Sequence, residues 1–241
     1  MYVAQDQLLF FPKPNHSEAA AALADREWQT TRGGTTLRGW LLPSPKGGNA
    51  PLVLYFGGNA QDIALLAAAK QVAANQLFLN YRGYGSSDGE PSAEAFKTDA
   101  LHIYDRAVAS IPHNGNVIAQ GRSLGSGVAT YLAAHRPIAG LILVTPYDSI
   151  ANVAREHYPW LPISLLLEHH FDSAALAPNI LQPALILLAG RDSVIPPIHS
   201  ETLAKAWGGP IEIQTFPSAT HNSIGSTARA KAVVAEFVSR F

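Results

Sequence analysis

The sequence predicts an α/β protein with a doubly wound, mostly parallel sheet, an N-terminal β-hairpin and a small helical cap. Short apolar runs bounded by Gly, Pro or Asn recur along the chain, and stretches of helical periodicity separate them. Hydrophobic residues make up 47% and charged residues 15% of the 241 residues, a composition that excludes intrinsic disorder and supports a sizeable core. We therefore expect one domain over residues 1–241.

The predicted strands fall into two groups. Residues 27–32 and 35–43 have strand-like composition and are joined by Gly33 and Gly34, a two-residue hairpin signal. The other runs are apolar at nearly every position, which is typical of strands buried on both faces of a parallel sheet. These runs cover residues 51–57, 76–81, 116–121, 138–145 and 184–190, and a last strand follows at 211–216.

Helical patterns fill the intervals between the strands. Apolar side chains between Phe96 and Ile111 recur on one helical face, and further helices are expected at about 60–74, 123–136, 197–207 and 225–240. Strand–helix–strand alternation requires right-handed crossovers and so gives a doubly wound sheet. Residues 148–182 are too many for a simple connection. We expect an inserted cap there, made of helical turns broken by Pro159, Pro162 and Pro178.

Composition also narrows the classes of function. The net charge of −1 gives no electrostatic case for binding nucleic acid or an anionic membrane. The chain has no cysteine, which excludes disulfides, thiolate catalysis and cysteine-based metal sites. No apolar run reaches the length of a membrane span, and the N-terminal run Leu8–Phe11 lacks the basic residues of a signal peptide. We expect a soluble protein, cytoplasmic rather than periplasmic or membrane-anchored, unless an upstream segment has been removed.

A candidate nucleophile lies where the strand at 116–121 meets the next helix. Gly121-Arg122-Ser123-Leu124-Gly125 is a G-x-S-x-G sequence, and a strand-to-helix turn is the context that a nucleophile elbow requires. The turn is so tight that side chains two residues before and after the serine would collide, which accounts for both glycines. The alternative is a chance match in a structural Gly-rich turn.

A serine hydroxyl needs a base to take its proton and an acid to orient that base. His221 is the candidate base because it follows the last strand, in a loop that should open at the same edge of the sheet as Ser123. Asp192 follows the strand at 184–190 and is the favoured acid. Asp148, which follows the preceding strand, is the alternative acid; either aspartate could instead cap a helix.

An oxyanion hole is predicted from two backbone N–H groups. One belongs to Leu124, directly after the nucleophile, and the other is expected in the loop after the strand at 51–57. That loop contains Gly57-Gly58-Asn59, and Asn59 is the expected donor. The alternative role of Asn59 is to cap the following helix.

These segments together resemble the α/β-hydrolase superfamily, in particular the branch of serine-aminopeptidase-like hydrolases and protein depalmitoylases of the α/β-hydrolase-domain type. The resemblance spans most of residues 40–225, and its most branch-specific part is the NYRGYG stretch at 80–85. It rests on LYFGGNAQD, LNYRGYGSSDGEPSAEAFKTDA, GRSLGSGVA, FDS, AGRDSVIPPIHS and SATHN.

The resemblance implies a Ser123–His221–Asp192 triad, oxyanion donors at Asn59 and Leu124, and no cofactor. One departure is Gly57, because the family often has His-Gly-Asn where this chain has Gly-Gly-Asn. Bacterial relatives in this branch often carry a membrane anchor before a QD-x-L-x-F-x-P stretch, which here covers residues 5–12.

The expected function is hydrolysis of an ester or thioester through an acyl-enzyme, on a small acyl substrate or an acylated protein. The alternatives are an aminopeptidase or amidase with the same triad, and a non-catalytic scaffold that binds a ligand or partner. No evident acidic cluster is present to hold a free amino terminus. The apolar cap residues Tyr158–Leu167 either line an acyl pocket or pack the cap onto the sheet. The Glu168-His169-His170-x-Asp172 stretch is not expected to bind a metal, because adjacent histidines point in different directions on a helix.

Overall fold

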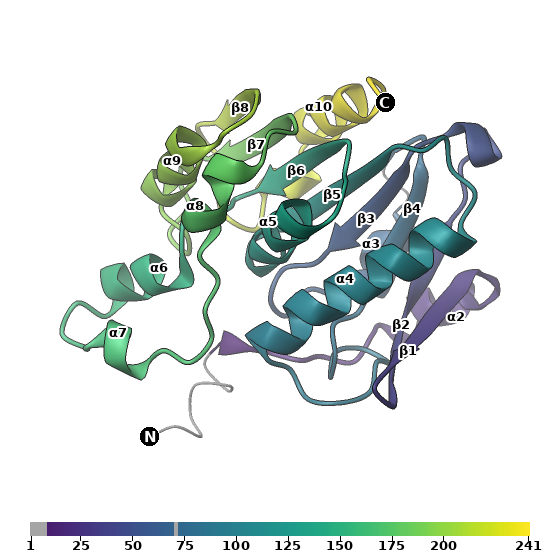
Figure 1. The fold of residues 1–241 in the computed structure, drawn as a ribbon, viewed down its shortest axis with the longest axis horizontal. Helices are drawn as coiled ribbons and strands as arrows, with labels where there is room; N and C mark the ends of the chain where they lie inside the picture. The colour runs from purple at the N-terminus through teal and green to yellow at the C-terminus, as the bar shows by residue number, and fades with distance from the viewer. Residues whose placement is uncertain (1–8, 70–71) are drawn as a thin grey trace.

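All eight strands belong to one sheet. The structure, a computed structural model, describes residues 9–69 and 72–241, and the side chains of residues 164 and 165 are outside the description (Figure 1). The strands are β1 (Glu27–Arg32), β2 (Thr35–Leu42), β3 (Leu52–Phe56), β4 (Asn75–Leu79), β5 (Val117–Arg122), β6 (Gly140–Val144), β7 (Ala184–Ala189) and β8 (Ile211–Phe216). Their order is β1-β2-β4-β3-β5-β6-β7-β8.

Among the strands that the structure describes, β2 alone runs opposite to the other seven. It pairs antiparallel with β1 and β4, and every other pair is parallel. Gly33 and Gly34 join β1 to β2 with φ of 55° and 78°, the positive values that a type I′ hairpin turn needs at both central positions. The predicted fold class, including this hairpin, is confirmed.

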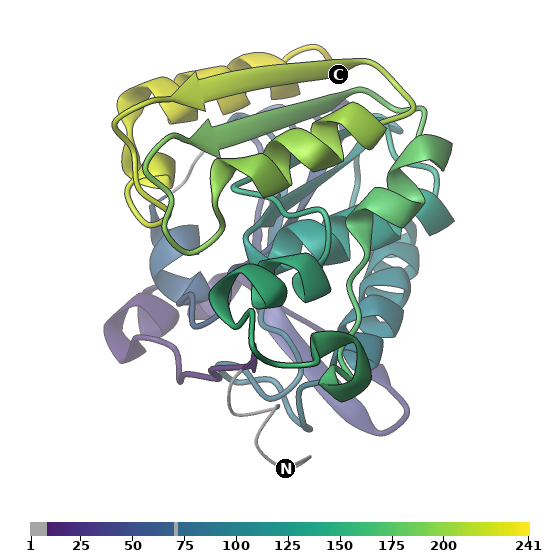
Figure 2. The same ribbon diagram turned by 90° about the vertical axis from the view of Figure 1, so that its left-hand side faces the viewer.

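Helices cover both faces of the sheet. The longer ones are α4 (Ala93–Ser110), α5 (Leu124–His135), α9 (Pro197–Ala206) and α10 (Ala228–Val238), and the shorter ones on the body are α2 (Ser17–Ala22), α3 (Ile63–Ala68) and α8 (Ser173–Leu176). The core between the sheet and α4, α5, α8 and α9 is separate from the cores under α10 and under α2 and α3. Figure 2 shows α9 and α10 on opposite sides of β7 and β8.

Two predicted helices are shorter than the sequence pattern suggested. In place of a helix over 60–74, α3 begins only after Asp62, whose carboxylate accepts the N–H groups of Ala64 and Leu65; residues 70 and 71 lie outside the described part. The final helix begins at Ala228 rather than at about 225, because Ile224–Ser226 form a 3₁₀ turn and Thr227 caps the helix. Of the predicted N-terminal run and the stretch at 5–12, only residues from Leu9 onward are described.

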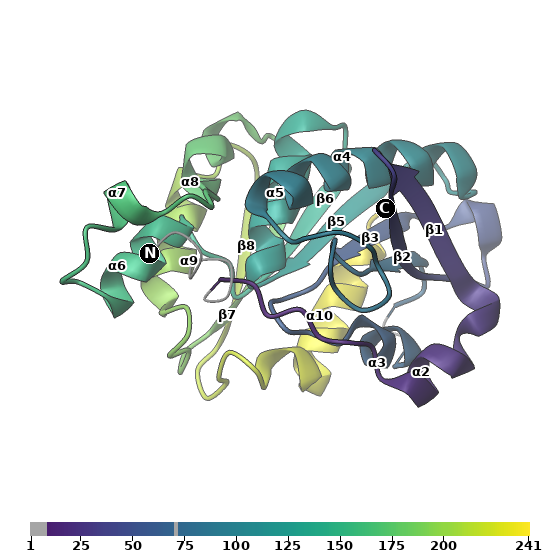
Figure 3. The same cartoon turned by 90° about the horizontal axis from the view of Figure 1, so that it is seen from below.

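The segment predicted as a cap over 148–182 has two parts. Helices α6 (Ile150–His157) and α7 (Ile163–Leu166) lie apart from the sheet (Figures 1 and 3). In contrast, Phe171, Ala177 and Ile180 are buried in the same core as α5 and α9. Ile150 and Val153 of α6 also pack against this core, so the segment predicted as a cap contacts the body near both of its ends.

The order of the strands determines where a site can form. The chain moves from β3 to β4 on one side and then returns to β5 on the other side of β3. In a doubly wound sheet the loops after two such strands diverge and leave a crevice at their carboxyl ends. The loop after β3 holds Gly57-Gly58-Asn59 and the turn after β5 holds Ser123, so both predicted segments meet at this crevice.

Candidate active site

Ser123 lies in a strained turn between β5 and α5. Its φ of 51° and ψ of −120° fall in a region that residues other than glycine rarely adopt, at a typical cost of about 1–3 kcal/mol. The Ser123 N–H donates to the carbonyl oxygen of Val144 at 2.9 Å, which ties the turn to the neighbouring strand β6. The sheet therefore holds the serine in the geometry expected of a nucleophile elbow.

The glycines of G-x-S-x-G allow the backbone to make two close contacts. A Cβ atom on Gly121 would lie 2.2 Å from the carbonyl oxygen of Gly125. A Cβ atom on Gly125 would lie 2.1 Å from the carbonyl oxygen of Phe56, at the end of β3. The predicted collision is thus between side chain and backbone, and the second glycine also lets α5 approach β3, the strand that precedes Gly57-Gly58-Asn59.

We expect Gly121→Ala to destabilise the protein by about 3 kcal/mol, since the contacted atoms are backbone and cannot move aside. Gly225→Ala is the matched control, because a Cβ atom there meets nothing within 4 Å and the change should cost under about 0.5 kcal/mol. Chemical unfolding of both variants measures the difference. Equal free energies of unfolding would show that the tight turn is not needed.

His221 joins the two other residues predicted for the site. Its Nε2 lies 2.9 Å from Ser123 Oγ, and its Nδ1 lies 2.7 Å from Asp192 Oδ2. All three residues are buried, with 7–8% of their surface exposed. The structure thus brings Ser123, His221 and Asp192 into one hydrogen-bonded line, and their burial strengthens each electrostatic interaction along it.

The backbone around Asp192 fixes its carboxylate. Oδ1 accepts the N–H groups of Val194 and Ile195 at 2.9 and 2.8 Å, which leaves Oδ2 for His221. Asp192 is not the cap of α9, because Pro196 occupies that position without a side-chain hydrogen bond. The carboxylate therefore has one orientation, and its free oxygen faces the imidazole.

Arg122 is a site residue that the sequence reasoning missed. Its Nη2 donates to the carbonyl oxygen of His221 at 3.0 Å and to the side-chain oxygen of Asn222 at 2.9 Å. It thereby ties the elbow to the loop that carries His221. A charged residue at the second position of G-x-S-x-G was the available signal, but its partner is 99 residues away along the chain.

Asp148, the alternative acid, belongs to a separate cluster. Its Oδ1 lies 2.8 Å from Nδ1 of His199, whose Nε2 lies 2.8 Å from Oε2 of Glu156 on α6. Ser149, not Asp148, caps α6. The structure therefore pairs His221 with Asp192 and uses Asp148 to connect the base of the cap to α9.

The two predicted oxyanion donors have no acceptor among the residues that the structure describes. No hydrogen bond within 9–69 and 72–241 uses the N–H of Asn59 or of Leu124. The N–H of Gly58 instead donates to the side chain of Gln61 at 2.8 Å. A Cβ atom on Gly58 would lie 3.5 Å from Ser123 Cβ, so the loop passes directly beside the serine. Asn59 does not cap α3, because Asp62 does.

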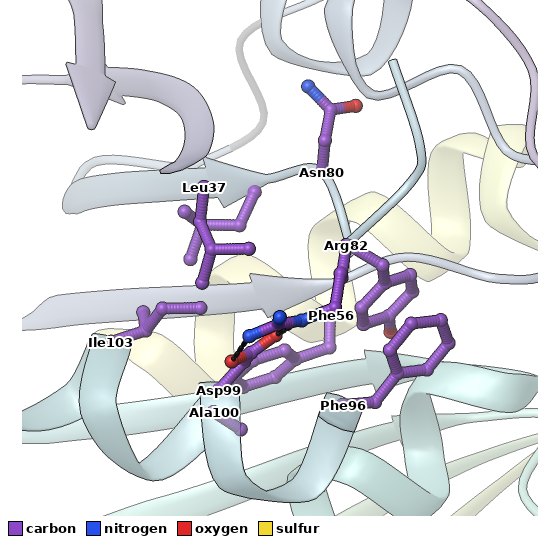
Figure 4. Close-up of a pocket in the computed structure, with 10 residues that line it drawn as sticks. Leu37, Phe56, Asn80, Arg82, Phe96, Asp99, Ala100 and Ile103 are labelled. Carbon is purple, nitrogen blue, oxygen red and sulfur yellow. Dashed lines mark hydrogen bonds and ion pairs between the residues drawn. The ribbon is translucent and has the colours of Figure 1, made fainter. Parts of the chain in front are cut away.

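The NYRGYG stretch anchors the loop after β4 to the body. Arg82 forms a bidentate ion pair with Asp99 of α4, with N–O distances of 2.9 and 2.7 Å (Figure 4). Hydrogen bonding to Asp99 raises the pKa of the Arg82 guanidinium. The cavity beside this pair measures about 10 Å³, roughly the space of one water molecule. Ser123 is not among the residues that line this cavity, which lies where the loop after β4 packs on α4.

The cap residues divide by exposure. Trp160 is 74% exposed and Tyr158 and Leu161 are 49% and 41% exposed, whereas Ile163 is buried. These three exposed side chains do not pack the cap onto the sheet, and the side chain of Leu165 lies outside the description.

Within the described ranges, no three His, Asp or Glu side chains form a cluster that could hold a metal ion. None of the helices in the described part is long and apolar enough to cross a membrane.

Comparisons with known proteins give relatives over most of the chain, although no family model matches it. An uncharacterized protein of Mycobacterium tuberculosis is 34% identical over 226 residues, which cover 90% of this chain and 80% of that protein. The α/β hydrolase domain-containing protein WAV2 of Arabidopsis thaliana is 26% identical and covers 80% of this chain and 71% of its own length. The lysophosphatidylserine lipase ABHD12 of Gallus gallus is 29% identical over 71% of this chain and 50% of the lipase. This chain therefore spans about half the length of that lipase.

Solved structures share the fold. Est1E of Butyrivibrio proteoclasticus, solved with ferulic acid, superposes with a TM-score of 0.68 at 17% identity and covers 89% of this chain and 97% of its own. An acetyl xylan esterase of Paenibacillus sp. R4 gives a TM-score of 0.69 at 15% identity over the full length of both chains. At these identities the likeness concerns the fold alone.

Proposed function

The chain belongs to the α/β-hydrolase superfamily, and we propose that it is a serine hydrolase that cleaves carboxylic esters or thioesters. Among its relatives, WAV2 is named as an α/β hydrolase domain-containing protein and ABHD12 as a lysophosphatidylserine lipase. The observation that supports a serine mechanism is the hydrogen-bonded line from Ser123 Oγ through His221 to Asp192, with distances of 2.9 and 2.7 Å. These are distances at which a base can take the proton of a nucleophile.

The proposed mechanism has two halves. His221 Nε2 takes the proton of Ser123 while Oγ attacks the carbonyl carbon, and the oxyanion is held by the N–H groups of Asn59 and Leu124. His221 then gives the proton to the leaving alcohol or thiol, which leaves an acyl group on Ser123. A water molecule, deprotonated by His221, releases the acid and restores the serine. Asp192 holds the imidazole with Nδ1 protonated throughout.

The proposed substrates are esters and thioesters with small to medium acyl groups. A lysophosphatidylserine lipase stands among the relatives, which favours an ester over an amide. The exposed apolar side chains of Tyr158, Trp160 and Leu161 give the cap a surface that an acyl chain could contact. Turnover of esters with increasing acyl length tests this part of the proposal, and background rates across the whole series would contradict it.

A fluorophosphonate probe tests the serine mechanism without knowledge of the substrate. Such a probe reacts only with a serine that is activated and reachable. Intact mass should show one adduct on the wild-type protein and none on Ser123→Ala. An unlabelled wild-type protein would contradict the proposal and favour a scaffold that binds a ligand without chemistry, whereas a labelled Ser123→Ala variant would place the nucleophile elsewhere.

A further inference from the structure

The loop that carries Asn59 is also held by hydrogen bonds of the Asn59 side chain to residues other than Ser123. Residues 9–13, which we call the strap, run across this loop. Asn59 Nδ2 donates to the carbonyl oxygen of Leu9 at 2.8 Å, and the Phe11 N–H donates to Asn59 Oδ1 at 2.9 Å. The side chain of Asn59 is therefore turned toward the strap, and its backbone N–H is left without an acceptor in the described part of the chain.

Two tyrosines of NYRGYG complete this arrangement. The Tyr84 hydroxyl donates to Asn59 Oδ1 at 2.7 Å and accepts the Phe11 N–H at 3.0 Å. The Tyr81 hydroxyl donates to the carbonyl oxygen of Gly57 at 2.8 Å. Both ends of Gly57-Gly58-Asn59 are thus fixed by phenol groups from one neighbouring loop.

The phenol groups are themselves fixed. The Tyr81 ring stacks on Phe96 of α4 with centroids 4.3 Å apart, and the Tyr84 ring meets the same Phe96 edge-on at 5.9 Å. Gly85 has a φ of 56°, and a Cβ atom there would lie 2.4 Å from the Asn80 side chain, so any other residue at this position would be strained. Burial raises the pKa of both tyrosines, which keeps them as neutral hydroxyl donors.

Such rigidity matters more for the transition state than for binding the substrate. An oxyanion donor stabilises charge that forms only as the bond to serine forms, and losing one donor commonly costs about 10²- to 10³-fold in kcat. A displacement on the order of 1 Å can also cost about 10²-fold. The N–H groups of Asn59 and Leu124 can stabilise the oxyanion fully only if the loop that carries Asn59 is held in place before the reaction.

We propose that Tyr84, together with Tyr81 and the strap, is a positioning device that pre-forms the oxyanion hole by holding Asn59 through its side chain. This role gives NYRGYG a function in catalysis although the hydrogen bonds of Tyr81, Arg82 and Tyr84 go to residues other than Ser123. The inference rests on the proposed serine-hydrolase function. The strap also reaches the cap, because the Phe10 ring contacts His169 at 4.8 Å between centroids and Phe96 at 5.1 Å.

Tyr84→Phe is the test, because it removes the hydroxyl and keeps the ring. We expect kcat to fall roughly tenfold with KM nearly unchanged, since the loss falls on the transition state. Affinity for a trifluoromethyl ketone, which forms an oxyanion on the serine, should fall by a similar factor. Binding of the acid product, which carries no tetrahedral oxyanion, should stay the same.

Tyr104→Phe is the matched control. Tyr104 is also a buried tyrosine, and its hydroxyl donates to the backbone carbonyl oxygen of Pro137, remote from Ser123. Thermal unfolding should show similar losses for the two variants, while only Tyr84→Phe changes kcat. Hydrogen exchange should be faster over residues 57–60 in Tyr84→Phe alone.

The outcomes separate the two proposals. An active wild type with equal kcat for Tyr84→Phe and Tyr104→Phe would overturn the positioning role and leave the serine-hydrolase function standing. A fall in ketone affinity that matches the fall in kcat, with KM unchanged, supports the positioning role. A wild type with neither turnover nor a fluorophosphonate adduct would overturn the function and, with it, the catalytic role of the tyrosines.

Discussion

Ser123→Ala is expected to lower kcat for ester hydrolysis by about 10³- to 10⁶-fold, because the acyl-enzyme can no longer form. The residual rate comes from the oxyanion hole and from substrate binding, which do not need the hydroxyl. KM should change little, since the serine acts in the chemical step. Steady-state kinetics on a chromogenic ester, with protein at high concentration for the variant, measures the ratio.

The control for this prediction is a second buried serine. Ser173 on α8 is 1% exposed, and its hydroxyl has no hydrogen-bond partner in the described part of the structure. Ser173→Ala removes an unsatisfied polar group and should leave both activity and stability near those of wild type. Full activity in Ser123→Ala would show that the chemistry does not pass through this serine.

The central strands of the sheet could be predicted well because they are apolar at nearly every position. In β3, β5, β6 and β7 the side chains on both faces are buried, so each strand appears in the sequence as a continuous apolar run. Helix ends were harder to predict, since they depend on local caps. Asp62 delays the start of α3 and Thr227 delays the start of α10, although the apolar pattern begins earlier in both.

The residues at the ends of strands were predictable for a related reason. In a parallel sheet the carboxyl ends lie along one edge, so Ser123, Asp192 and His221 had to approach each other once the strands were known. The choice between Asp192 and Asp148 depends on the strand order. His221 follows β8, whose neighbour is β7, so the loop after β7 is nearer than the loop after β6.

Contacts that depend on side-chain direction were not predictable. Arg122 reaches His221, and Tyr84 reaches Asn59, across 99 and 25 residues. Nothing in the periodicity of either segment indicates those partners. The same is true of His199, which the sequence places on a helix but which the structure pairs with Asp148 and Glu156.

Asp192→Asn is expected to lower kcat by about 10⁴-fold through the tautomer of His221. The N–H groups of Val194 and Ile195 point at Oδ1, so the new amide must place its oxygen there and turn its NH₂ group toward His221. Nδ1 then becomes the acceptor, and the imidazole proton moves to Nε2. A protonated Nε2 cannot take the proton of Ser123, although the two atoms remain in contact.

Asp148→Asn is the matched comparison, because it makes the same change in the other predicted acid. Asp148 contacts His199 and the side chain of Asn152, so we expect a loss of about 1–3 kcal/mol in stability and a kcat within a few-fold of wild type. Kinetics and chemical unfolding on both variants give the two effects separately. The opposite pattern, with activity lost in Asp148→Asn and kept in Asp192→Asn, would exchange the roles of the two aspartates. It would also mean that His221 turns away from Asp192 before the reaction, against the 2.7 Å contact between Nδ1 and Oδ2.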